Sequence, residues 1–66
     1  MLVQYQLDLN AISPQAQEEL LTKLDGFTWT GFKRRGRGVY GCYVEREADA
    51  EVIRSYLPDG CTMTKL

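Results

Sequence analysis

The sequence contains no histidine, and its 66 residues include only two cysteines, Cys42 and Cys61. Neither cysteine has a second Cys or a His at the spacing that metal ligands show, so the residues indicate no metal site. Two cysteines are also too few to define the disulfide framework of a small secreted domain. We expect both thiols to act as small buried side chains, and we expect no metal and no cofactor.

Long apolar runs are absent as well. No run approaches the roughly 20 residues that a membrane-spanning helix needs. The first residues, 1–5, lack the basic and apolar regions of a signal peptide. We therefore expect a cytoplasmic protein without a membrane partner.

The composition is that of a globular protein. Hydrophobic residues make up 44% of the chain and charged residues 26%, which argues against disorder. The length leaves room for one compact α+β domain, residues 1–66, with one thin core. A chain of this size buries about 60% of its unfolded surface, so we expect a stability of only a few kcal/mol.

The first elements have clear signals. Hydrophobic and polar residues alternate from Val3 to Leu9, which predicts a half-buried strand. Ser13 and Pro14 are typical of a helix start, since serine caps free N–H groups and proline fits the first helical position. We expect this helix to run over 14–25, because Gly26 follows.

The rest of the chain continues the pattern. Two runs rich in β-forming residues, 27–32 and 39–45, flank a glycine-bearing segment and predict a β-hairpin. An apolar stripe over 48–57, followed by Pro58, predicts a second helix. Alternation over 61–66 predicts a last strand.

The predicted order, β-α-β-β-α-β, is that of the ferredoxin-like fold, with two helices on one face of a four-stranded antiparallel sheet. In its usual strand order, 4-1-3-2, the strands 3–9 and 39–45 are central and 27–32 and 61–66 are edges. The two cysteines then lie roughly 10 Å apart, beyond disulfide reach. Edge pairing would allow a homodimer as well as a monomer.

Charge is strongly segregated along the chain. Eight Lys and Arg stand against nine Asp and Glu, and four of the eight cations fall within five residues: Lys33, Arg34, Arg35 and Arg37, here called the basic segment. The remainder has four cations against nine carboxylates, a net charge of −5. We expect the basic segment to form the hairpin tip, near the amino end of the first helix, and to bind an anionic partner. The alternative, a solvated turn that only aids solubility, stays open.

The sheet face opposite the helices is the second candidate surface. We expect Phe27 and Trp29 to face inward, and Phe32 and Tyr43 to face outward beside the basic segment. Exposed aromatic residues next to cations bind single-stranded nucleic acid, by stacking on bases and holding phosphates. The RNA-recognition motif has this topology, but the aromatic residues after Arg37 are out of register with its third-strand pattern.

Catalysis has little support in the sequence. The glycines of residues 36–41 have the spacing G-x-G-x-x-G, but they lead from a hairpin into a strand, whereas a dinucleotide site needs a following helix. No nucleophile–base pair is visible. We therefore expect a non-enzymatic binding protein, a regulator or inhibitor of the kind phages and mobile elements encode, that docks on an acidic or phosphate-lined surface of a larger protein or nucleoprotein. The alternative is a module that binds RNA or single-stranded DNA.

Overall fold

Strands β1 (Val3–Asp8) and β3 (Val39–Val44) form the centre of an antiparallel sheet in the computed structural model, which describes all residues from 1 to 66. Strand β4 (Thr62–Lys65) pairs with β1, and β2 (Lys33–Gly36) pairs with β3. The resulting order, β2-β3-β1-β4, is the predicted one. The fold is a small α+β fold of ferredoxin-like topology, as the sequence predicts.

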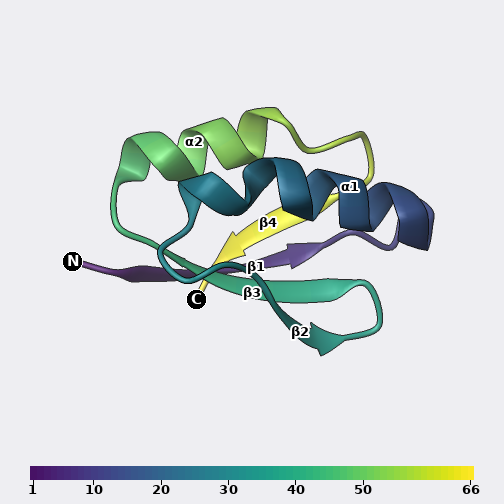
Figure 1. Cartoon of the computed structure of the whole chain (residues 1–66), viewed down its shortest axis with the longest axis horizontal. Coiled ribbons are helices and arrows are strands. Elements are labelled where there is room, and N and C mark those ends of the chain that lie inside the picture. Colours follow the sequence, from purple (N-terminus) through teal and green to yellow (C-terminus); the bar gives the residue numbers. More distant parts are fainter.

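Both helices cover the same face of this sheet (Figure 1). Helix α1 (Pro14–Leu24) begins where expected, because the Ser13 hydroxyl accepts a hydrogen bond of 3.2 Å from the Ala16 N–H. Helix α2 (Glu47–Ser55) carries two acidic residues in its first turn, where they interact favourably with the helix dipole. The other face of the sheet has no covering layer, and we call it the open face.

The core lies between the sheet and the helices. Its fully buried large side chains come from every layer: Leu7, Leu9, Leu24, Val44 and Ile53. Leu7 stands at the centre, paired across the sheet with Tyr40 on one side and Met63 on the other. The alternation on β1 therefore buries the face that the sequence assigned to the core.

The predicted strand over 27–32 is wrong. A short 3₁₀ helix occupies Asp25–Phe27, and bends follow it. The Thr28 hydroxyl donates to the Asp25 carbonyl at 2.8 Å and accepts from the Gly31 N–H at 2.9 Å, and Gly31 has a left-handed φ of 87°. Local bonds of this kind compete with strand pairing, and here they prevail over the β-propensity of the aromatic residues.

Trp29 also departs from the prediction, since its side chain is 61% exposed and not directed into the core. Its backbone N–H still donates to the Tyr43 carbonyl at 2.9 Å, so the segment follows β3 without forming a regular ladder. The large aromatic side chain therefore contributes little to the buried apolar surface.

The edge strand is instead the basic segment. Residues Lys33–Gly36 form β2, and only Arg37 and Gly38 remain in the turn to β3. The pairing shifts register between Arg34 and Gly36, which makes a β-bulge at Arg35. The expectation of a basic tip is thus corrected to a basic edge strand, because pairing with a central strand outweighs the low β-propensity of Lys and Arg.

The two cysteines are free thiols, and Cys42 is only 3% exposed. Burial raises the pKa of the Cys42 thiol from 9.0 to about 11. Burial also raises the pKa of the Cys61 thiol, which remains partly accessible. The predicted packing role is therefore confirmed for Cys42 and holds only in part for Cys61.

We expect iodoacetamide to alkylate Cys61 well before Cys42 in the native protein at pH 8. The thiolate reacts, and a pKa of about 11 lowers its fraction about 100-fold relative to a pKa of 9, while burial blocks access to Cys42. Timed alkylation followed by peptide mass spectrometry measures both rates. In 8 M urea the two rates should become similar, and equal native rates would contradict the burial of Cys42.

Candidate functional site

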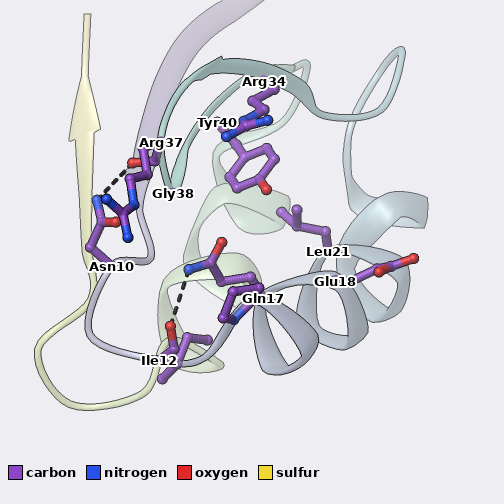
Figure 2. Close-up of a pocket in the computed structure, with 10 residues that line it drawn as sticks. Asn10, Ile12, Gln17, Glu18, Leu21, Arg34, Arg37, Gly38 and Tyr40 are labelled. Atoms are coloured by element: carbon purple, nitrogen blue, oxygen red, sulfur yellow. Dashed lines mark hydrogen bonds between the residues drawn. The ribbon is translucent and has the colours of Figure 1, made fainter.

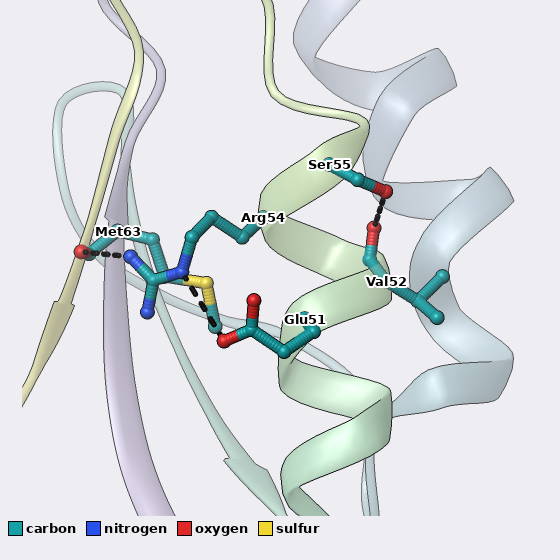
Figure 3. Close-up of polar contacts among 5 residues, drawn as sticks. All are labelled: Glu51, Val52, Arg54, Ser55 and Met63. Carbon is teal, nitrogen blue, oxygen red and sulfur yellow. Dashed lines mark hydrogen bonds and ion pairs between the residues drawn. The ribbon is translucent and has the colours of Figure 1, made fainter.

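All four cations of the basic segment are exposed, and none is within 4.0 Å of a carboxylate oxygen. The one ion pair of the structure lies elsewhere, between Arg54 Nε and Glu51 Oε1 at 3.8 Å. Arg54 also donates to the Met63 carbonyl at 3.5 Å, so its guanidinium already has protein partners (Figure 3). In the basic segment only Arg34 donates a side-chain hydrogen bond within the protein, from Nε to the Gly36 carbonyl at 3.3 Å, and no carboxylate neutralises any of the four charges. The basic segment is therefore a concentration of positive charge that can meet an external anion.

The bulged strand divides the basic segment between two surfaces. Arg34 pairs with Tyr40, whose side chain faces α1, and both line a groove on the helix side of the sheet. Arg35 lies across Gly41 on the open face, where a Cβ atom at Gly41 would stand 2.8 Å from Arg35 Nε. Glycine at position 41 thus lets the Arg35 side chain lie close to the sheet.

The open face has the polar character that the sequence predicts. Gln4, Gln6 and Asp8 of β1 stand opposite Tyr43, Gly41 and Val39 of β3. Tyr43 is 37% exposed, as expected for an outward residue. The open face therefore presents Tyr43 and Arg35 together on β3 and its neighbouring edge strand.

The outward position predicted for Phe32 is wrong. Phe32 packs against the core and lines a hollow with Leu21 of α1 and Tyr40. The reason is its place in the register: Phe32 lies two residues before Arg34, so it shares the helix side of the sheet. Of the two aromatic residues proposed for partner contact, only Tyr43 is on the open face.

The groove on the helix side lies between the amino-terminal half of α1 and the β2–β3 turn (Figure 2). It has a volume of about 550 Å³ and is lined by Arg34 and Arg37 on the hairpin and by Gln17 and Glu18 on the helix. Two arginines therefore line one groove close to the amino end of α1, as the predicted fold implies.

Asn10 ties the β2–β3 turn to the segment between β1 and α1, beside the backbone hydrogen bond of 2.7 Å from the Leu9 N–H to the Gly38 carbonyl. Asn10 Nδ2 donates to the Arg37 carbonyl at 2.9 Å and to Asp8 Oδ1 at 3.0 Å. The Asn10 backbone N–H donates to the same Asp8 oxygen at 3.0 Å. The β2–β3 turn is thereby fixed to the segment that leads into α1, and one oxygen of the Asp8 carboxylate, Oδ1, accepts both hydrogen bonds from Asn10.

Gln17 is a residue of the groove that the sequence reading did not select. Its side chain is 7% exposed, and its Nε2 donates to the Leu9 carbonyl at 3.0 Å and to the Ile12 carbonyl at 3.1 Å. A signal for this burial exists, because Gln17 precedes Leu20, Leu21 and Leu24 by three, four and seven residues, on the same helical stripe.

Comparisons with known proteins give no functional lead. No protein-family model matches this chain, and neither a curated protein nor a solved structure does. None of its helices has the length and apolar character needed to cross a membrane. No group of three or more His, Cys, Asp or Glu side chains is placed to hold a metal ion.

Proposed function

We propose that this protein is a non-enzymatic binding protein that docks through its basic segment on an anionic surface of a larger protein or nucleoprotein. The observation that carries the proposal is a set of four exposed cations, three on an edge strand and the fourth in the turn that follows it, none of them paired with a carboxylate. Such a surface attracts an anionic partner at one place, while the rest of the chain, with its net negative charge, does not.

The edge position of the basic segment supports a protein partner. Strand β2 pairs with β3 on one side, and its other side has no neighbouring strand. Addition of a partner strand to such an edge is a common mode of peptide recognition. A partner strand with acidic side chains would meet cations on both faces of β2. Docking by one edge suits a small regulator or inhibitor.

A second candidate function is binding of RNA or single-stranded DNA on the open face. The observation in its favour is that Arg35 lies flat across Gly41, on the face that also exposes Tyr43. A ring that stacks on a base and a guanidinium that holds a phosphate are the usual elements of such sites. The negative charge elsewhere on the protein opposes a long polyanion, so we place this function second.

We expect the variant with Arg34, Arg35 and Arg37 replaced by Glu to lose at least tenfold in partner affinity, since attraction becomes repulsion. Its folding should change little, because exposed substitutions typically cost within about 0.5 kcal/mol each. Quantitative affinity capture from the source cell, together with thermal unfolding, measures both effects.

The matched control replaces Lys23, Arg46 and Lys65 with Glu, three exposed cations outside the basic segment that give the same change in net charge. Equal capture by the two variants would contradict the proposal. Titration of labelled single-stranded RNA and DNA across a salt series separates the two functions. Four phosphate contacts would give a log–log slope of about −3, and absence of binding at low salt excludes the nucleic-acid function.

A further inference from the structure

The Gln17 amide has one atom without a partner. Both Nε2 hydrogens are used on the Leu9 and Ile12 carbonyls, and the reversed amide would place an oxygen against two oxygens, so the orientation is fixed. No hydrogen bond is donated to Oε1 by any group of the protein. Since every fully buried side-chain nitrogen or oxygen has a partner, Oε1 must be reached by solvent.

The groove is where Oε1 meets that solvent. Gln17 lines the groove, and Figure 2 shows its oxygen directed away from Ile12, toward the side on which Tyr40 lies. An acceptor fixed in this way is prepared for a ligand that brings an N–H or O–H donor. Gln17 as a whole is more than nine-tenths buried, and its two Nε2 hydrogen bonds hold the acceptor in place.

The opposite wall supplies positive charge. Arg34 projects from β2 and Arg37 from the turn, and neither guanidinium has a carboxylate partner. Arg34 Nε donates to the Gly36 carbonyl at 3.3 Å, which leaves its two terminal nitrogens for a ligand. The first turn of α1 contains no acidic residue, so the positive end of the helix dipole adds to the same field. A guanidinium can bind a carboxylate through two parallel hydrogen bonds. An arginine therefore fixes the orientation of an acidic side chain as well as attracting its charge.

The groove also has a feature that disfavours a polyanion. Glu18 lines it together with the two arginines, so the local excess of positive charge is small. A nucleic-acid strand brings a charge at every nucleotide, whereas a peptide brings one carboxylate with a backbone N–H beside it. The volume of about 550 Å³ is within the range of small-ligand sites. The two arginines and Gln17 Oε1 are therefore best matched by one acidic side chain together with a backbone N–H next to it.

We propose that this groove binds a carboxylate side chain of an acidic peptide segment, with Arg34 and Arg37 holding the carboxylate and Gln17 Oε1 accepting a backbone N–H of the same segment. The inference rests on the proposed function and makes it specific, because it assigns the contact to the helix side of the basic segment. Arg35, on the open face, has no part in it.

The test is an NMR titration of the ¹⁵N-labelled protein with three short peptides at millimolar concentration. They are acetyl-Ala-Asp-Ala-amide, its Asn counterpart, and the Asp peptide with every backbone nitrogen methylated. We expect the Asp peptide to shift the signals of the Gln17 side-chain amide and of Gly38. The Asn peptide should bind at least tenfold more weakly, and the methylated one about fivefold more weakly, through loss of one hydrogen bond.

Protein variants complete the design. Arg34→Gln and Arg37→Gln should each weaken binding of the Asp peptide severalfold, whereas Arg35→Gln, the same change on the open face, should weaken it much less. A substitution at Gln17 would also remove the bonds to Leu9 and Ile12, so the methylated peptide is the test of the Oε1 contact.

Three results would overturn the inference. One is equal binding of the Asp and Asn peptides, and another is equal weakening by Arg34→Gln and Arg35→Gln. The third is tighter binding of inorganic phosphate or a dinucleotide in the groove than of the Asp peptide. If the wild type captures its partner, the triple-Glu variant does not, and the Asp peptide leaves the groove signals unmoved, then the inference fails while the proposed function stands.

Discussion

Replacing Leu7 with Ala should unfold a large part of the population at 37 °C. Leu7 is 0% exposed at the centre of β1, where residues of both neighbouring strands and the helix layer surround it. Substitutions of this kind cost about 2–5 kcal/mol, through lost apolar burial and the cavity left behind. A domain of this length has only a few kcal/mol in total, so the loss is comparable with its whole stability.

Thermal and urea unfolding followed by circular dichroism measure this loss. The matched control is Trp29→Ala, which removes a larger side chain that is 61% exposed. We expect the control to lose less than about 1 kcal/mol, since exposed substitutions are usually close to neutral. A Trp29 variant that unfolds as readily as the Leu7 variant would show that the core is not centred on β1.

Replacing Gly38 with Val should destabilise the hairpin and the groove together, by at least about 2 kcal/mol. Gly38 has a φ of 68°, in the left-handed region where a β-branched residue costs about 1–3 kcal/mol. A Cβ atom at this position would also overlap the side-chain amide of Asn10. The valine variant must therefore displace the hydrogen bond from Asn10 Nδ2 to the Arg37 carbonyl.

Urea unfolding gives the stability, and hydrogen exchange of the turn amides gives the local effect. Gly36→Ala is the control, because Gly36 lies just before the same turn, has no positive φ and has open space around its Cβ position. We expect the alanine variant to remain within about 0.5 kcal/mol of the wild type. If the valine variant is equally stable, the Asn10 contact does not hold the turn.

The sequence predicts the topology because its signals are local and agree with one another. Each element is marked by residues within it or directly beside it, such as the alternation on β1, Ser13 before α1 and Pro58 after α2. The error over 27–36 has a different origin. Thr28 and Gly31 stabilise bends in a run of β-formers, while Lys33 to Gly36 form a strand only because β3 lies beside them. The β-propensity of individual residues does not show which strand will lie beside them.

The candidate site was predictable in its charge and not in its geometry. The basic segment is visible in the sequence as four cations in five residues. Arg34 and Arg35 face opposite sides because consecutive strand residues alternate, but which of the two lies on the helix side depends on the pairing register, and this is set only when the strands meet. Gln17 was overlooked because a glutamine in an amphipathic helix usually faces solvent.

The cationic edge strand also affects self-association of the protein. An unpaired strand edge invites the same edge of a second molecule, but two copies of β2 side by side would align Lys33, Arg34 and Arg35 against like charges. The charges on β2 therefore favour pairing with an acidic strand and disfavour pairing with a second copy of β2. Salt weakens both the attraction of an acidic strand and the repulsion between two copies of β2, since the Debye length falls from about 10 Å at 0.1 M to about 3 Å at 1 M.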